Sequence, residues 1–151
     1  LSPKRFNGRR IEMNWNRLRQ IYSQIPKSSC PPDCGECCGI LFPSLAELRN
    51  IKDWLSKHNI EYKDFHMTVG LDCPYLSENK ACAIYPVRPF LCRILGVSHD
   101  LPCPIGKCKP SKLLNHPQSS ALYKAIYLHG KNKSRTEKHR RLVRELLRLE
   151  V

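Results

Sequence analysis

The sequence predicts a small, mainly α-helical single domain, with about four helices around a loop-rich core that contains cysteines. Two observations carry this prediction. Apolar residues recur at helical spacing in four segments, and no segment has the alternation of apolar and polar residues that is typical of a strand. The 151 residues also include nine cysteines, all in the middle of the chain, where proline and glycine interrupt regular structure.

The first two predicted helices have clear boundaries. The first spans about residues 14–25, and Pro26 ends it. The second begins at Ser44, because Ser44 and Glu47 have the spacing of a capping box, and it stops near residues 58–59. Their apolar faces consist of Trp15, Leu18, Ile21, Tyr22 and Ile25, and of Leu45, Leu48, Ile51 and Leu55.

Two more helices are predicted near the C-terminal end. One spans about residues 119–129 and stops at Gly130, and the other begins at Ser134 with a capping box to Glu137. The chain then divides into a basic arm with the first helix (1–27), a cysteine-rich core (28–118) and two C-terminal helices (119–151), the last strongly basic. The apolar positions of these helices are Leu122, Ala125, Ile126 and His129, and Leu142, Val143, Leu146, Leu147 and Leu149.

The cysteines favour metal binding over disulfides for three reasons. No export signal precedes them and no stretch approaches the roughly 20 apolar residues that span a bilayer, so we expect a reducing, cytoplasmic location without membrane association. An odd number leaves one thiol unpaired. Four of the cysteines also fall within nine residues, whereas disulfide scaffolds usually join distant loops. We therefore predict zinc or an iron–sulfur cluster, in one or two sites.

The cysteines form three groups whose short spacing lets neighbouring thiols reach one ion with little loss of chain entropy. Gly35 and Gly106 permit tight turns within two of these groups. Side chains of adjacent cysteines tend to point apart, so the pair in the first group serves two sites, or one is a ligand and the other is buried. The groups are Cys30, Cys34, Cys37 and Cys38; Cys73, Cys82 and Cys92; and Cys103 and Cys108.

Cys30, Cys34 and Cys37 have the CxxxCxxC spacing with which radical S-adenosylmethionine enzymes hold a cubane cluster. Those enzymes need a barrel of strands and helices far longer than 151 residues. The spacing is therefore compatible with a cubane and does not indicate radical chemistry.

Two motifs in the right order resemble the CxxCxxCC proteins, also called the YkgJ-type zinc- or iron-chelating domain. The first is Cys30-Pro-Pro-Asp-Cys34-Gly-Glu-Cys37-Cys38, which has one residue more than the family pattern between its first two cysteines. The second runs from Cys82-Ala-Ile-Tyr85 through Arg88-Pro-Phe-Leu-Cys92-Arg93. The resemblance covers about residues 28–108.

The resemblance implies a metal centre built from these cysteines. The same domain occurs in flagellin lysine methylases, which raises S-adenosylmethionine-dependent methyl transfer, but the chain has no glycine-rich strand–helix loop for a nucleotide. Whether the chain is an enzyme stays open. Tyr85, Arg88 and Arg93 either bind an anionic substrate or, as we favour, neutralise the thiolates and donate hydrogen bonds to sulfur. His99, the histidine nearest the third group, is expected to be a surface residue.

The net charge of +13 is concentrated at the two ends. Residues 1–29 carry +6, residues 30–130 carry +2 and residues 131–151 carry +5. Basic ends around a metal core predict docking on RNA, a ribonucleoprotein or an acidic protein, although many such charge runs are simply solvated. The residues concerned are Lys4, Arg5, Arg9, Arg10, Lys138, Arg140, Arg141, Arg144 and Arg148.

Three functions remain open from the sequence. In the first, the metal is structural and the basic ends dock on an acidic partner. In the second, an iron–sulfur cluster has a redox or methyl-transfer role. In the third, the protein carries metal to other proteins, with a spare thiolate at the adjacent pair Cys37 and Cys38.

Overall fold

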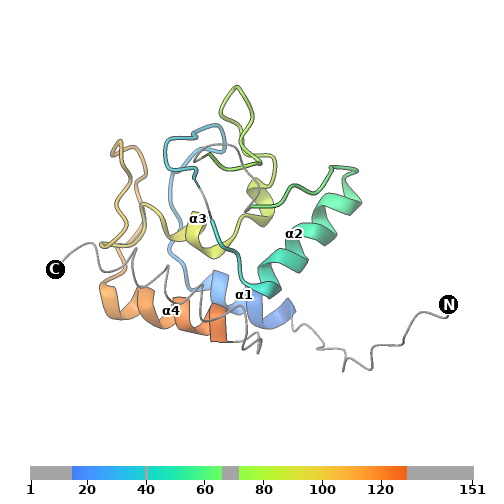
Figure 1. The fold of residues 1–151 in the computed structure, drawn as a ribbon. Coiled ribbons are helices and arrows are strands. Elements are labelled where there is room, and N and C mark those ends of the chain that lie inside the picture. Colours follow the sequence, from blue (N-terminus) through green and yellow to red (C-terminus); the bar gives the residue numbers. More distant parts are fainter. Residues whose placement is uncertain (1–14, 40, 66–71, 129–151) are drawn as a thin grey trace.

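Helices form the base of the structure and long loops lie above them (Figure 1). The computed structural model describes residues 15–39, 41–65 and 72–128. These ranges contain no strand, and none of their helices is long and apolar enough to cross a membrane. The predicted mainly helical class is therefore confirmed. The elements are α1 (Trp15–Ser23), α2 (Leu45–Lys57), the 3-10 helix η1 (Tyr85–Val87), α3 (Phe90–Ile94) and α4 (His116–Leu128).

The first two helices agree closely with the prediction. At the end of α1, the Ile25 N–H donates to the Tyr22 carbonyl at 3.1 Å, a tight final turn before Pro26. The capping box of α2 is present in both directions, because the Glu47 N–H donates to Ser44 Oγ at 3.3 Å and the Ser44 N–H donates to Glu47 Oε2 at 2.9 Å.

Helix α4 begins at His116, three residues before the predicted start at Ser119. A second reciprocal pair of bonds explains the difference. The Gln118 N–H donates to Asn115 Oδ1 at 2.9 Å, and the Asn115 N–H donates to Gln118 Oε1 at 3.0 Å. Pro117 then lies in the first turn, where its missing N–H costs nothing. The Asn-x-x-Gln pattern was the signal for this start.

Helix α3 was not predicted, because its five residues are too few to show a helical period. Phe90 and Ile94 at its two ends are both buried, so tertiary packing holds this short helix. The described residues contain four α-helices, and α3 is one of them although it was not predicted. The predicted helix from Ser134 and the predicted basic arm lie outside the described residues.

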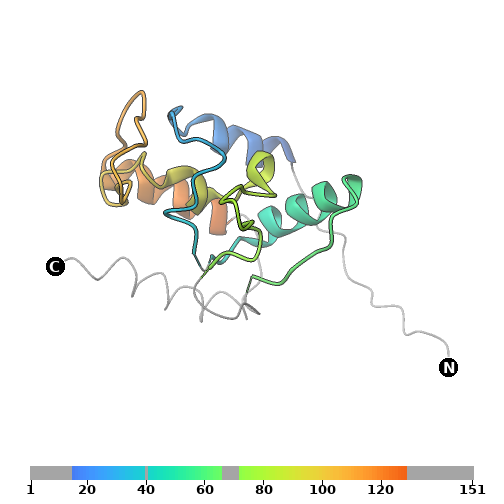
Figure 2. The ribbon, with the colours of Figure 1, turned by 90° about the horizontal axis from the view of Figure 1, so that it is seen from above.

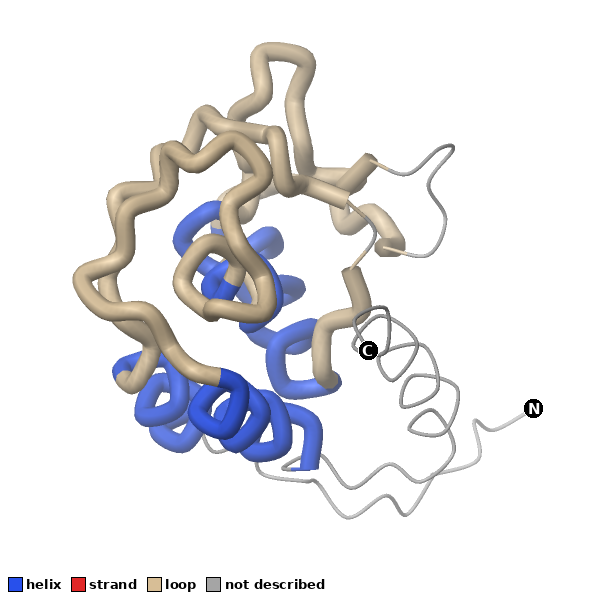
Figure 3. The backbone as a smooth tube through the Cα atoms, turned by 90° about the vertical axis from the view of Figure 1, so that its left-hand side faces the viewer, coloured by secondary structure: helices blue, strands red, loops and turns tan. Residues whose placement is uncertain are grey.

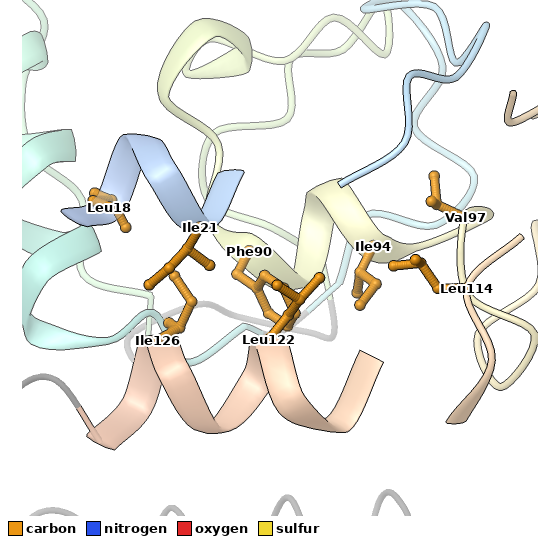
Figure 4. Close-up of a cluster of buried hydrophobic side chains, with 8 residues drawn as sticks. All are labelled: Leu18, Ile21, Phe90, Ile94, Val97, Leu114, Leu122 and Ile126. Carbon is orange, nitrogen blue, oxygen red and sulfur yellow. The ribbon is translucent and has the colours of Figure 1, made fainter. Parts of the chain in front are cut away.

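The first apolar cluster lies between α1, α3 and α4 (Figure 4). Helix α1 contributes the predicted positions Leu18 and Ile21, and α4 contributes the predicted Leu122 and Ile126. Because the segment after α3 also enters this cluster, the base anchors the loops that follow α3. The remaining members are Phe90, Ile94, Val97 and Leu114.

The second apolar cluster joins α2 to the loops. Seen from above, α2 lies to one side of α1 and α4 (Figure 2). Its residues Ile51 and Leu55 are almost fully buried in the cluster, and Leu48 packs against it. Most other members come from loops, so α2 is the only described helix of more than one turn in this half of the core. The other members are Leu41, Phe65, Cys73, Tyr75, Ile84 and Val87.

Glu47 connects three helices with one fully buried carboxylate. Besides the cap of α2, it accepts hydrogen bonds from the Tyr22 hydroxyl of α1 at 2.8 Å and from the Phe90 N–H of α3 at 2.5 Å. Burial raises the pKa of Glu47, and the bonds from Ser44, Phe90 and Tyr22 oppose that rise. All three partners donate hydrogen bonds to Glu47, and an ionised carboxylate can only accept them.

We expect Glu47→Gln to lower the free energy of unfolding by about 1–3 kcal/mol. Gln has one oxygen and one amide NH₂, so at least one of the three buried donors would face another donor. Chemical denaturation followed by circular dichroism measures the loss.

Asp53→Asn on the same helix is the control. Its carboxylate pairs with Lys57 at 2.8 Å on an exposed surface, so its removal should cost only about 0.3–0.5 kcal/mol. Equal losses for the two variants would show that the buried carboxylate does not hold the helices together.

Candidate metal centre

The nine cysteines all lie within the described residues and are all free thiols. Eight belong to the loops above the helices, and Cys92 belongs to α3. Figure 3 shows these loops as a separate layer on one side of the helices. Their side chains fall into two groups with different surroundings.

Backbone pairing brings Cys30 beside Cys108, which is 78 positions away in the sequence. The Ser29 N–H donates to the Lys109 carbonyl at 3.1 Å, and the Lys109 N–H donates to Ser29 Oγ at 3.1 Å. The Ser111 N–H donates to the Lys27 carbonyl at 2.8 Å. The first and third cysteine groups of the sequence therefore meet along this seam.

Five thiols line one small cavity at this seam, and we call them the outer group. The cavity measures about 10 Å³, which is space for one water-sized occupant. Most of the residues that line the cavity are partly buried, and Cys108 is buried. The outer group consists of Cys30, Cys34, Cys37, Cys103 and Cys108, and Glu36, Leu95 and Pro104 complete the lining.

Electrostatics differ among the outer thiols. Burial, together with the thiols of Cys108, Cys37 and Cys34, raises the pKa of Cys30 to about 11. The pKa of Cys103 is instead lowered, because backbone N–H groups of its own loop stabilise the thiolate. Such N–H groups are the usual supports of a metal-bound sulfur. They belong to Cys108, Ile105, Lys107 and Gly106.

Gly96, which follows α3, lies against the outer group and was not singled out in the sequence. It has φ of +78°, and a Cβ at this position would lie 2.6 Å from Cys108 Sγ and 3.4 Å from Cys103 Cβ. Only glycine fits such a contact in a left-handed conformation. A glycine directly after an apolar turn was the only sequence signal.

The other four thiols, which we call the inner group, are Cys38, Cys73, Cys82 and Cys92. Local turns arrange two of them: the Leu76 N–H donates to the Cys73 carbonyl at 3.1 Å, and the Ala83 N–H donates to the Tyr75 carbonyl at 2.9 Å. The chain segments that carry Cys73 and Cys82 thereby lie side by side. Cys92 reaches the same region from α3.

The inner group is embedded in the second apolar cluster. Cys73 is a buried member of that cluster, and Cys38, Cys82 and Cys92 pack against it. Burial raises the pKa of Cys38 to about 12, with contributions from neighbouring thiols that include Cys37, Cys73 and Cys82. Burial also raises the pKa of Cys92 well above its ordinary value, followed by the effects of Cys73, Cys82 and Cys38. These four thiols are thus close enough to affect one another's ionisation.

The adjacent cysteines separate the two groups. Cys37 lines the outer cavity, whereas Cys38 packs against the second apolar cluster. The two adjacent side chains therefore lie in different surroundings, as both alternatives for this pair require.

The donor set fits a metal by its chemistry, because clustered thiolates are the preferred ligands of zinc and of iron–sulfur clusters. As the side chains stand, no three described Cys, His, Asp or Glu residues are close enough to hold one ion. Each thiol gives up its proton when it binds a cation, and the attraction between thiolate and cation would draw the sulfurs of each group inward.

Two of the three predicted supporting residues lie beside the thiols. The Tyr85 hydroxyl donates to the Cys30 carbonyl at 2.7 Å, and the Arg88 guanidinium stacks over the Tyr85 ring at 3.8 Å from its centroid. Arg88 lowers the pKa of Cys30 in the outer group and of Cys82 in the inner group, although burial dominates both. Arg88 is thus positioned to neutralise both groups.

Arg93 instead holds the helices together. Its Nε donates to the Arg88 carbonyl at 2.8 Å, and its guanidinium lies 4.1 Å from the centroid of the Tyr22 ring. His99 is exposed, as expected. The residues predicted to bind nucleic acid lie outside the described ranges; they are Lys4, Arg5, Arg9, Arg10, Lys138, Arg140, Arg141, Arg144 and Arg148.

Comparison with known families gives one match, which covers residues 29–119, more than half of the chain. The family is CxxCxxCC, described as "Putative zinc- or iron-chelating domain". The chain belongs to this family. The matched region contains all nine cysteines and none of the residues predicted to bind nucleic acid, so family membership supports metal binding and says nothing of the basic ends. Searches of curated proteins and of solved structures found no match.

We expect Gly96→Ala to destabilise the protein and to displace the Cys108 thiol. The left-handed conformation alone costs an alanine roughly 1–2 kcal/mol. The overlap with sulfur adds roughly 1–3 kcal/mol, because the neighbouring atoms have to move. Thermal melting and metal content measure the two effects.

Gly106→Ala is the matched control, since Gly106 has φ of +66° but a Cβ placed there would have nothing within 4 Å. This variant should show only the conformational cost. Equal melting temperatures and metal contents in the two variants would contradict the close approach of Gly96 to the outer group.

Proposed function

We propose that the protein binds zinc or an iron–sulfur cluster through its cysteines and that the metal holds the loop layer in place. The observation that carries this proposal is that nine free thiols converge in two groups above a helical base. Thiols gathered in this way in a reducing, cytoplasmic setting suit metal ligation.

A structural role for the metal follows from how little else holds the loops. Residues 28–39 and 101–113 contain no regular element and no buried member of either apolar cluster. Where a chain provides few apolar contacts, the free energy of metal binding becomes free energy of folding. We infer that the metal centre has a structural role. It holds the loops in a fixed arrangement and thereby positions the rest of the chain.

Redox or methyl-transfer chemistry is the second candidate, and metal transfer is the third. A cluster with a redox role would give iron and sulfide in the protein. Transfer would need one group of thiols to be reached from solvent, and the outer group meets that requirement because four of its five cysteines are partly exposed.

Purified anaerobically, the full chain should contain stoichiometric zinc or iron. Colourless protein with zinc favours the structural role, whereas brown protein with iron and sulfide favours the cluster. The measurements are elemental analysis and an absorbance scan. A well-folded chain with neither metal would refute the proposed function.

Metal binding should also release protons. Near neutral pH the metal-free Cys30 and Cys38 thiols are protonated, because their pKa values are raised to about 11 and about 12. Each such thiol gives up a proton when it binds a cation. The release should therefore be large near neutral pH and should decline as the pH rises toward about 11. A pH indicator in weakly buffered solution measures it during Zn²⁺ addition.

We further propose that the basic ends dock on RNA, alone or in a ribonucleoprotein, with an acidic protein as the other candidate partner. The support is the charge distribution: residues 1–29 and 131–151 carry +6 and +5, whereas residues 30–130 carry only +2. Phosphate backbones attract such segments because binding releases counterions.

Replacing Lys138, Arg141, Arg144 and Arg148 by Gln should weaken binding to a fluorescent single-stranded RNA. It should also reduce the dependence of log Kd on log salt by about 0.7 for each phosphate that the chain no longer neutralises. Fluorescence anisotropy at several salt concentrations measures both.

The control removes the same charge from the centre of the chain, by Gln substitution of the exposed residues Arg49, Lys63, Lys112 and Lys124. Docking through the C-terminal basic segment would be contradicted if the chain did not bind RNA or if binding did not depend on salt. It would also be contradicted if both variants lost the same affinity. Binding of an acidic peptide but not RNA would favour the protein partner.

A further inference from the structure

We propose that the nine thiols form two separate metal centres with different tasks: a permanent inner centre and an outer centre that exchanges its metal. This inference rests on the proposed function and deepens it. The inner centre consists of Cys38, Cys73, Cys82 and Cys92. The outer centre consists of Cys30, Cys34, Cys37, Cys103 and Cys108.

The boundary between the outer and inner groups lies at the peptide bond between Cys37 and Cys38. Successive side chains of an irregular loop point in different directions, and here Cys37 lines the outer cavity while Cys38 packs against the second apolar cluster. A single centre would need both thiols to turn to the same side. The two groups are joined by this peptide bond and by Arg88, and the Cys82 N–H donates to the Pro32 carbonyl at 3.1 Å between their loops.

The surroundings of the two groups differ in the way that their tasks require. Around the inner group lie Tyr75, Ile84 and Val87, which are at most 9% exposed. Around the outer group lie Pro104, Ile105 and Lys107, which are all exposed. Four outer cysteines are partly exposed, so a chelator or a partner protein can approach them. Three inner cysteines are partly exposed as well, but all four belong to or pack against the second apolar cluster, so removing an inner ion would disturb that packing.

The number of thiols differs as well. Four thiolates satisfy one tetrahedral zinc ion, which is the closed arrangement of structural sites. The outer cavity is lined by five, so one thiol remains without a coordination position whenever one ion is bound. A spare thiolate can replace any of the four, and ligand replacement of this kind is how a metal passes between proteins.

The adjacent cysteines provide the matched test. The full chain is prepared with Zn²⁺ as the only added metal. The wild type should hold two zinc ions, one of which passes rapidly to a colorimetric chelator while the protein stays folded. Cys37→Ser should still hold two ions, because four outer thiols remain. Cys38→Ser should hold one and melt at a lower temperature, because three inner thiols remain.

A double variant covers the case in which Cys38→Ser does not fold. Cys37→Ser with Cys103→Ser leaves three outer thiols, so it should keep one slowly released ion, lose the rapid phase and melt close to the wild type. The two-centre inference is overturned by one zinc ion in the wild type. It is also overturned by equal effects of Cys37→Ser and Cys38→Ser, or by loss of both ions in the double variant. A wild type that binds neither zinc nor iron refutes the proposed function itself.

Discussion

The buried carboxylate of Glu47 is the constraint on which the rest of the structure depends. One side chain satisfies the cap of α2, the hydroxyl of Tyr22 on α1 and the first N–H of α3. A short helix such as α3 has too few internal hydrogen bonds to be stable alone. Its position, and with it that of Cys92 and of Gly96 beyond its end, is therefore determined by a group on another helix.

The loop layer is organised differently from the base. Apolar packing orders the helices, whereas backbone pairing between distant loops places the cysteines. The hydrogen bonds between Ser29 and Lys109 bring the first and third cysteine groups together, and the bond from the Cys82 N–H to the Pro32 carbonyl at 3.1 Å connects the first and second. Each half of the molecule thus has its own source of stability, and both meet at α3.

Much of the base could be predicted from the sequence, because the apolar periodicity of α1 and α2 is long and the capping box of Ser44 and Glu47 is explicit. Helix α3 could not be predicted, since five residues show no period, and nothing local indicates that Glu47 also reaches two other helices. The cysteines could be recognised as ligand candidates from their spacing. Their division could not, because it depends on pairing between distant residues such as Ser29 and Lys109, which residue types do not encode.

The single peptide bond between Cys37 and Cys38 has a thermodynamic consequence. If each thiol holds an ion, occupancy of one centre fixes a peptide plane that the other centre also uses. The two binding equilibria then have a coupling free energy, and coupling of this kind is reciprocal. The factor by which an inner ion changes affinity at the outer centre is then the factor by which an outer ion changes affinity at the inner centre. Where that factor exceeds one, release of the outer ion weakens binding of the inner ion by the same factor.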